Sequence, residues 1–499
     1  MSIEEFDVVV LLGAVVLLVA VAAVRLAVRT GLPSLLLYLG LGLVLGADVL
    51  GLKFDDARLA GVLGYAALIL ILAEGGLTTR WSTVRDAVAP AAVLATFGTA
   101  VSIAVTGVAA AWILRLPWPQ AMLVGAIVSS TDAAAVFSVL RRVPLPARLV
   151  GLLEAESGFN DAPVVIAVLA LTEIAGGGVS HSPGYYLLVA ALELAAGAAV
   201  GLGVGFLGAQ GLRRIALPAS GLYPIATLGF AAAAYGLAAA LHGSGFLATY
   251  LAALVLGNSR LPHRGAVRGF AEGVGWMAQI GLFVMLGLLA TPSHLGDAVL
   301  PAIGVGLALL LLARPASVLV SVSWFGIGWR EQVLLSWAGL RGAVPIVLAT
   351  IPVAAGVQHS NGVFELVFVL VVIFTLVQGP TLPWIARRLG LAAAVSAVDL
   401  DVEASPLGAL DADVLQVHVG PTSRLHGVEV FELRLPKSAN VTLVVRGEES
   451  FVPGPTTMLR HGDDLIVVVP SMVRQATEER LRQVSAGGKL AGWLGTAGR

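Results

Sequence analysis

Glu154-Ala-Glu-Ser-Gly-Phe-Asn-Asp161 stands in the middle of an apolar run that extends from about Ala147 to Ile174. A helix turns by about 100° per residue, so four polar residues of this stretch fall within an arc of about 140° and can share one face: Glu156, Ser157, Asn160 and Asp161. A carboxylate near the centre of a bilayer costs about 3 kcal/mol and normally faces other protein or a water-filled path. The stretch therefore predicts a functional site inside a membrane-spanning helix.

The composition agrees with a membrane protein. Of 499 residues, 58% are hydrophobic and only 12% are charged, and the mean hydropathy is +0.92, whereas soluble domains carry about 25% charged residues. The net charge of -1 provides no basic surplus for phosphates, which argues against a nucleic-acid partner. The chain has no cysteine, which excludes disulfides and thiolate metal sites. Its acidic start, Met1 to Asp7, is unlike a signal peptide, so we expect the first apolar run to be a retained spanning helix.

Breaks at Gly, Pro and charge clusters divide the chain into about 13 apolar segments, most of them of the roughly 20 residues that a spanning helix needs. We expect these segments at 6–28, 31–52, 58–77, 87–113, 119–141, 147–175, 184–212, 221–241, 244–258, 270–290, 297–324, 331–354 and 362–386. The predicted fold is an all-α polytopic membrane protein with a small α+β domain attached.

The basic residues predict an orientation, because cytoplasmic loops carry an excess of Lys and Arg. One set of alternate loops holds most of the arginines, at positions 25, 29, 80, 85, 141, 142, 148, 213, 214, 260, 264, 268, 330, 387 and 388. The other set holds only Lys53, Arg58 and Arg115. We therefore expect a multi-pass protein of the plasma membrane whose N-terminus lies outside and whose C-terminal domain is cytoplasmic.

The composition changes after Arg388. We expect a transmembrane domain at 1–389, a linker at 390–412, a cytoplasmic domain at 413–485 and a tail at 486–499. Short β-branched runs at 414–419, 441–445 and 465–469, followed by a helical segment, predict the α+β domain. A domain of this size has a marginal core, so pairing with a second copy in a homodimer would help it.

Two further segments place polar residues at the same depth as Asp161, counting about 1.5 Å per residue. Ser129-Ser-Thr-Asp132 lies midway through the fifth segment, and Gly339-Leu-Arg-Gly-Ala-Val-Pro345 lies midway through the twelfth. These two segments cross the membrane in opposite directions, as inverted repeats require. Their polar, Gly and Pro residues predict that both helices are broken. Asp132 suits the positive end of a half-helix, and Arg341 suits a negative end.

These residues carry a resemblance to a known family. Ser129 to Phe137, Glu154 to Asp161 and Leu340 to Pro345 resemble the signature segments of NhaP-type monovalent cation/proton antiporters, and the similarity covers about residues 6–388. Residues 403–485 are similar to the TrkA-C subdomain of potassium-conductance regulators. The combination resembles the NhaP-like potassium/proton antiporter branch, whose members are also called cell volume regulation proteins.

The resemblance implies a transporter rather than an enzyme, with no cofactor, that exchanges K+ or Na+ for H+ in pH homeostasis and cell volume regulation. It implies that Asp161 binds either the cation or a proton, and that the cation site is completed by Glu156, Ser157 and the Thr131 carbonyl. Asn160 stands where electrogenic relatives have a second aspartate, which implies electroneutral exchange. Competition at Asp161 and alternating access of the site would couple the two ions.

The supporting residues keep more than one interpretation. The resemblance implies that Asp132 steadies the crossing of the broken helices and that Arg341 pairs with Glu156, while contact of Arg341 with the ion stays open. Glu74 is either a gate residue or a solvated helix end. Arg314 is expected in a structural pairing whose partner the sequence does not name.

An alternative function is a ligand-gated cation channel, since regulator domains also attach to channels. A selectivity filter such as Thr-Val-Gly-Tyr-Gly is absent from the sequence, which disfavours it. The expected partners are membrane lipid, monovalent cations and protons, a second copy of the chain, and a nucleotide-type regulatory ligand at the cytoplasmic domain. The alternative function of the cytoplasmic domain is dimerisation alone, without regulation of transport.

Overall fold

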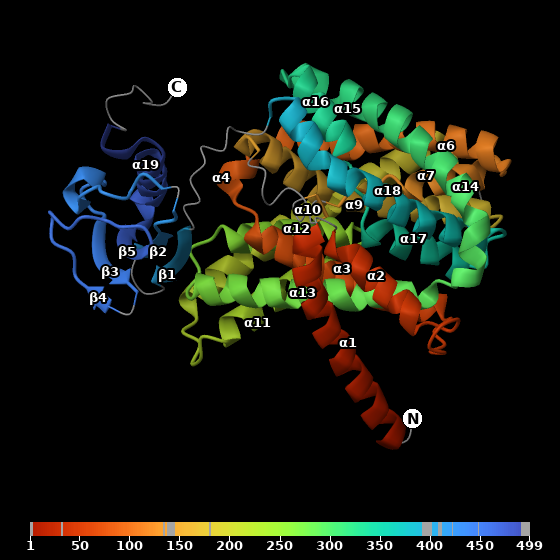
Figure 1. The fold of residues 1–499 in the computed structure, drawn as a ribbon. Coiled ribbons are helices and arrows are strands. Elements are labelled where there is room, and N and C mark those ends of the chain that lie inside the picture. Colours follow the sequence, from red (N-terminus) through yellow and green to blue (C-terminus); the bar gives the residue numbers. More distant parts are fainter. Residues whose placement is uncertain are drawn as a thin grey trace. The chain divides into compact units, whose positions relative to one another are not determined.

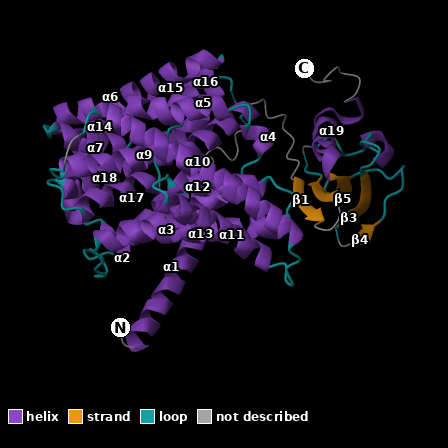
Figure 2. Ribbon diagram, turned by 180° about the vertical axis from the view of Figure 1, so that it is seen from behind, coloured by secondary structure: helices purple, strands orange, loops and turns teal. Residues whose placement is uncertain are grey.

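The computed structural model describes residues 3–30, 33–132, 135–136, 145–178, 181–391, 402–407, 412–421, 423–447 and 449–490. They form two compact units, a large helical one and a smaller one that contains a β-sheet (Figures 1 and 2). Some predictions lie outside the described residues. These are most of the fifth segment after Asp132, with Arg141 and Arg142, most of the linker 390–412, and residues 491–499.

The described part of the large unit consists mainly of helices (Figure 1). Their bounds are α1 Ile3–Thr30, α2 Ser34–Leu45, α3 Ala57–Thr78, α4 Trp81–Val84, α5 Val88–Val93, α6 Thr99–Leu114, α7 Trp118–Ile127, α9 Ala147–Ala175, α10 Pro183–Arg214, α11 Leu222–Ala240, α12 Gly245–Gly257, α13 Arg264–Leu289, α14 Pro292–Ala308, α15 Arg314–Val322, α16 Trp329–Trp337, α17 Ala343–Ala354 and α18 Ser360–Arg388. Helix α1 projects from the unit and packs mainly against α2 (Figures 1 and 2).

Eight helices in the described part of the chain are long and apolar enough to cross a membrane. Most expected segments agree closely with helices, and α9 spans 147–175 as predicted. The second segment is shorter than expected. Helix α2 ends at Leu45 because Gly46 adopts an extended conformation, and a tight turn then brings Leu52 back to pair with Gly46.

Two helices are interrupted where the sequence predicted. Helix α7 ends at Ile127 and is followed by a non-helical segment through Asp132, while α16 ends at Trp337 and α17 begins only at Ala343. The backbone N–H of Asp132 donates to the carbonyl of Leu340 over 2.8 Å, so the two interruptions lie against each other. Gly342 permits this close approach, because a Cβ atom there would lie 1.7 Å from a carboxylate oxygen of Asp132.

Two other helices continue through a π-helical turn, which the sequence did not predict. One turn, Leu94–Gly98, joins α5 to α6, and the other, Leu309–Ala313, joins α14 to α15. The two helices pack together here, and Ser317 Oγ donates to the Gly98 carbonyl over 2.7 Å. The second turn ends immediately before Arg314, so it sets the rotation at which this side chain enters the bundle. Such turns occur frequently at functional sites.

The smaller unit is an antiparallel five-stranded sheet in the order β1-β2-β5-β3-β4 (Figure 2). Its strands are β1 Val402–Leu407, β2 Ala412–His418, β3 Asn440–Arg446, β4 Glu449–Phe451 and β5 Asp463–Pro470. Alternate residues of β5, including Leu465 and Val467, are fully buried, and Leu481 and Val484 of α19 (Arg474–Gly487) join the same core. The three predicted strands and the following helix are therefore present, which confirms an α+β fold.

Candidate functional site

The polar face of α9 is covered by the non-helical segment that follows α7. Ser157 Oγ donates to the Thr131 carbonyl over 2.9 Å, and Asn160 Nδ2 donates to Thr131 Oγ1 over 2.6 Å. Ser130 Oγ donates to Asp161 Oδ1 over 2.7 Å. The structure thus brings the predicted residues of α9 together with Thr131, and it adds Ser130.

These groups are buried. Asp161 is 7% exposed and Asn160 is 1% exposed. Asn160 uses its amide nitrogen on Thr131, while its Oδ1 has no hydrogen-bond partner in the described part of the chain. One carboxylate, three hydroxyls, a carbonyl and an amide oxygen therefore lie close together. Oxygen ligands of this kind suit a hard cation, and the described residues contain no cluster of three or more His, Cys, Asp or Glu that could hold a metal ion.

Glu156 belongs to the same helical face but is engaged differently. Arg314 binds it through two contacts, Nη1 to Oε1 at 2.6 Å and Nη2 to Oε2 at 2.9 Å. Thr131 Oγ1 also lies 3.4 Å from Oε1. The expected pairing of Glu156 with Arg341 is therefore wrong: Arg314, whose partner the sequence did not name, takes that place because the π-helical turn directs it inward.

Arg341 instead lies at the ends of two half-helices. Its Nε donates to the Val128 carbonyl over 3.1 Å, just beyond α7, and its Nη1 donates to the Gly339 carbonyl, just beyond α16. Helix C-termini carry partial negative charge, so a buried guanidinium is favourable there. This placement agrees with the expectation that Arg341 suits a negative end.

Asp132 contacts the second interruption at Leu340 and Gly342. Its carboxylate accepts a hydrogen bond from the Ala135 N–H over 3.2 Å, as an N-capping residue does. Its own N–H donates to the Leu340 carbonyl of the other interruption. Asp132 therefore joins the two broken segments and provides negative charge where backbone N–H groups are exposed.

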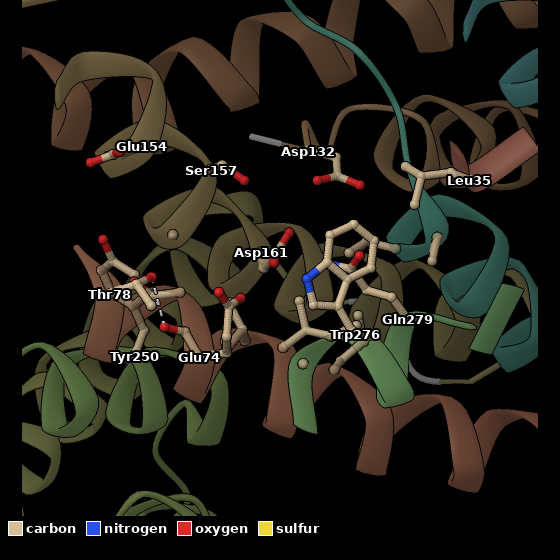
Figure 3. Close-up of a pocket in the computed structure, with 18 of the residues that line it drawn as sticks. Leu35, Glu74, Thr78, Asp132, Glu154, Ser157, Asp161, Tyr250, Trp276 and Gln279 are labelled. Carbon is tan, nitrogen blue, oxygen red and sulfur yellow. Dashed lines mark hydrogen bonds between the residues drawn. The ribbon is translucent and has the colours of Figure 1, made fainter. Parts of the chain in front are cut away.

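A cavity of about 450 Å³ leads to Asp161 (Figure 3). Five acidic residues line it, namely Glu74, Asp132, Glu154, Asp161 and Glu272. In Figure 3, Asp161 lies between Glu74 on one side and Trp276 with Gln279 on the other. Glu74, whose role the sequence left open, thus faces the same cavity as Asp161, and so does Glu154.

Tyr250 fixes one wall of this cavity. Its ring lies directly against Gly158, where a Cβ atom would be 2.4 Å from the ring, and it contacts Phe159 edge-on with centroids 5.7 Å apart. A glycine between Ser157 and Phe159 is therefore required for α12 to approach α9. The sequence offered no motif that singles out Tyr250, Trp276 or Gln279. Tyr250 belongs to an apolar helix, and Trp276 and Gln279 lie on one helix whose contact with the site depends on packing.

Comparisons with known proteins agree with this arrangement. The profile of the family described as "Sodium/hydrogen exchanger, transmembrane" matches residues 14–388, and that of the TrkA-C domain matches residues 414–482. The chain is 37% identical over 469 residues to the K(+)/H(+) antiporter NhaP2 of Shewanella oneidensis, covering 92% of this chain and 80% of that protein.

Two other relatives extend the comparison. The K(+)/H(+) antiporter NhaP of Alkalimonas amylolytica is 39% identical over 392 residues, which cover 78% of this chain and 68% of that protein. The sodium proton antiporter MjNhaP1 of Methanocaldococcus jannaschii has a similar fold, with a TM-score of 0.65 at 22% identity over 77% of this chain and 99% of that one. The chain therefore belongs to the sodium/hydrogen exchanger family, whose members are transporters, and it carries a TrkA-C domain.

Proposed function

We propose that this protein is a secondary antiporter that exchanges K+ or Na+ for H+ across the plasma membrane, and that cation and proton compete for Asp161. The observation that carries the proposal is the position of Asp161 at a cavity, among the oxygen atoms of Thr131, Ser157 and Asn160. A protonated carboxyl group holds a cation poorly, and a bound cation disfavours protonation. Competition at one group then couples the two fluxes.

The buried charges support electroneutral exchange. In the part of the chain that the structure describes, the buried carboxylates of Glu156 and Asp161 and the partly buried carboxylate of Asp132 share this region with two buried guanidinium groups, those of Arg314 and Arg341. When all five are ionised, one negative charge remains, and either one monovalent cation or one proton neutralises it. Asn160 adds an oxygen ligand without a further charge. We therefore assign Asp161, Ser157, Thr131 and Asn160 to the cation site, and Glu156 to its support through Thr131.

Three pairs of helices support an inverted repeat and thirteen crossings. The expected fourth and eleventh segments both contain a π-helical turn, the fifth and twelfth are both interrupted, and the sixth and thirteenth, α9 and α18, both have 29 residues. Members of each pair are seven segments apart and so run in opposite directions. This is the relationship that alternating access by two inverted halves uses.

The cavity supports an inward-facing state. Four lining residues, Ser34, Thr79, Glu154 and Glu272, lie near helix ends that the Arg distribution assigns to the cytoplasm. In this orientation the N-terminus lies outside and Glu74 stands in the access path. We further propose a homodimer whose cytoplasmic TrkA-C domain follows the transmembrane domain 1–389 and binds a nucleotide-type ligand. Strand β1, at 402–407, belongs to the sheet of this domain, so the segment expected as a linker at 390–412 is shorter than predicted.

The substrate proposal follows the names of the relatives. Two of them are named K(+)/H(+) antiporters, while a relative from Aphanothece halophytica, 29% identical over 369 residues, is named an Na(+)/H(+) antiporter. We therefore place K+ first and Na+ second. The test is to measure exchange in proteoliposomes with K+, Na+, Li+ and Rb+ in turn, at several pH values. The rates rank the four cations as substrates.

The test of the mechanism is Asp161→Asn in the same proteoliposomes. We expect this variant to insert and dimerise normally but to lose cation-driven proton movement, because an amide cannot exchange a proton for a cation. Asp86→Asn, which removes an exposed carboxylate outside the site, is the matched control and should be active. Retained exchange by Asp161→Asn contradicts the mechanism, and a failure of the wild type to move protons against an imposed cation gradient favours a channel.

A further inference from the structure

The interruption between α16 and α17 leaves backbone carbonyl groups without the partners that a continuous helix would provide, and buried carbonyl groups need hydrogen-bond donors. Two of these donors come from α18. Gln378 Nε2 donates to the Trp337 carbonyl over 3.0 Å, and Thr375 Oγ1 donates to the Arg341 carbonyl over 3.1 Å. Gln378 is 1% exposed and Thr375 is 2% exposed. Helix α18 therefore holds the interruption at both of its ends.

Between these two ends, the Leu340 carbonyl accepts a hydrogen bond from the Asp132 N–H over 2.8 Å. That N–H belongs to the peptide group that joins Thr131 to Asp132, and the carbonyl of the same group is the Thr131 ligand of the proposed cation site. The peptide bond is trans, so its N–H and its carbonyl point in opposite directions. The bond to Leu340 therefore aims the Thr131 carbonyl toward α9, where Ser157 Oγ donates to it over 2.9 Å.

We infer that Thr375 and Gln378 are positioning residues that hold the Leu340 carbonyl in place and so orient the Thr131 carbonyl toward the transported cation. The inference rests on the proposed function and adds a role for α18, which contributes none of the proposed ligands. Without either donor, a buried carbonyl of the interruption has no partner, and the segment shifts to find one. The Leu340 carbonyl shifts with it, so the Thr131 carbonyl is less well directed at the cation.

A neutral substitution at Thr375 or Gln378 leaves every charge of the site in place. The Arg341 guanidinium binds the Val128 carbonyl, whereas Thr375 contacts the backbone carbonyl of Arg341. We therefore expect such variants to bind the cation less tightly, because an oxygen ligand is misdirected, and to keep the maximal rate of exchange. A purely structural role predicts something different, namely a lower unfolding temperature with no change in the K+ concentration that binding requires.

Thr350 provides a matched control. It lies in α17, the half-helix that follows the interruption, and is 1% exposed. Its Oγ1 donates to the Val347 carbonyl over 2.6 Å, so this contact stays within α17. Thr350→Val and Thr375→Val each replace one buried hydroxyl group by a methyl group, but only Thr375→Val removes a donor to the interruption. Thr375→Ser keeps the hydroxyl group and is the conservative variant.

The experiment measures K+ binding and K+ transport separately, with full-length protein at constant ionic strength. Binding is followed in detergent as the rise in unfolding temperature with K+ concentration, and transport as K+-driven proton movement in proteoliposomes. For Thr375→Val and Gln378→Met we expect the half-effective K+ concentration and the apparent KM to rise about fivefold, the factor that one ordinary hydrogen bond provides. The maximal rate should be retained. Thr375→Ser and Thr350→Val should match the wild type in both measurements.

A wild-type K+ dependence in Thr375→Val or in Gln378→Met overturns the inference, however far the unfolding temperature falls. The same shift in Thr350→Val overturns it too, and so does failure of both α18 variants to fold, because the contacts would then serve the fold alone. Failure of the proposed function is a separate outcome, since it appears as retained exchange by Asp161→Asn. An inactive Asp161→Asn together with unshifted α18 variants contradicts the role of Thr375 and Gln378 alone.

Discussion

Arg314 and Glu156 form a bidentate ion pair with contacts of 2.6 and 2.9 Å, and their side chains are only 4% and 3% exposed. Each group neutralises the charge of the other, and both are buried. Removing one partner of such a pair leaves a buried charge uncompensated, which typically costs about 3–5 kcal/mol. The pair therefore holds α15, which begins at Arg314 after the π-helical turn, against α9 next to the proposed cation site.

We expect Arg314→Ala to lower the thermal stability of the purified protein strongly, by a free energy of about 3–5 kcal/mol. Arg314→Lys should be only a partial replacement, because an ammonium group cannot make the bidentate contact. Thermal unfolding in detergent measures both. Arg213→Ala, which removes an exposed arginine at the end of α10, is the control, and equal effects at positions 314 and 213 would contradict the role of the pair.

The crossing of the broken helices provides a second prediction. Gly342→Ala places a methyl group against the carboxylate of Asp132, so we expect the two interruptions to separate and both stability and exchange to fall. We expect a loss of roughly 1–3 kcal/mol, as at other overpacked sites, because the three atoms nearest to the added methyl group all belong to the Asp132 side chain. Gly236→Ala is the control, since a Cβ atom there has no neighbour within 4 Å. If stability and exchange of Gly342→Ala equal those of the wild type, the crossing has room for a methyl group, and the close approach of Gly342 to Asp132 is not required.

The access path provides a third prediction, and the absence of native cysteines makes it simple to test. Gln279→Cys and Trp276→Cys place thiols on α13 in the cavity. We expect a membrane-impermeant maleimide to label both from the cytoplasmic side, in inverted vesicles, far faster than from the outside. Ser102→Cys, at a buried position in α6, should stay unlabelled. Preferential labelling from the outside would contradict the inward-facing assignment.

Much of this arrangement follows from the sequence, because its signals are local. The spacing of Glu156, Ser157, Asn160 and Asp161 on one helical face depends only on helix geometry. The two interruptions depend on residues that weaken the local hydrogen-bond ladder. The alternating β-branched runs in the small unit likewise predicted β2, β3 and β5 in place.

The partners of the charged residues could not be predicted in the same way. Whether Glu156 meets Arg314 or Arg341 depends on a rotation set by the π-helical turn Leu309–Ala313, and an apolar Leu-rich segment contains no sign of that turn. The contact of Ser130 with Asp161 depends on how two distant segments pack. In the sequence, Ser130 is marked only by its position inside the polar stretch Ser129-Ser-Thr-Asp132.

The last prediction concerns Asp463 in the small unit, whose side chain is fully buried against Arg446. Burial alone would raise the pKa of Asp463. The hydrogen bonds from the Arg446 guanidinium and the Arg460 N–H lower the pKa by more than burial raises it, so the folded pKa lies below the ordinary value of 3.8. A carboxyl group with a lowered pKa contributes stability above its unfolded pKa, and that contribution is lost as the pH falls through the folded value.

We therefore expect β5 to open more readily as the pH falls below about 4. Asp463→Asn should lower the free energy of opening at neutral pH by about 2 kcal/mol, since it removes charged hydrogen bonds. In this variant the free energy of opening should no longer fall as the pH falls below about 4. Hydrogen exchange of the β5 amides in the full-length protein, corrected for intrinsic rates at each pH, measures this. Asp464→Asn is the control, because Asp464 pairs with the partly exposed His418 where β2 ends and β5 begins. If opening of β5 depends on pH in both variants as it does in the wild type, the Asp463–Arg446 pair is not the cause of that pH dependence.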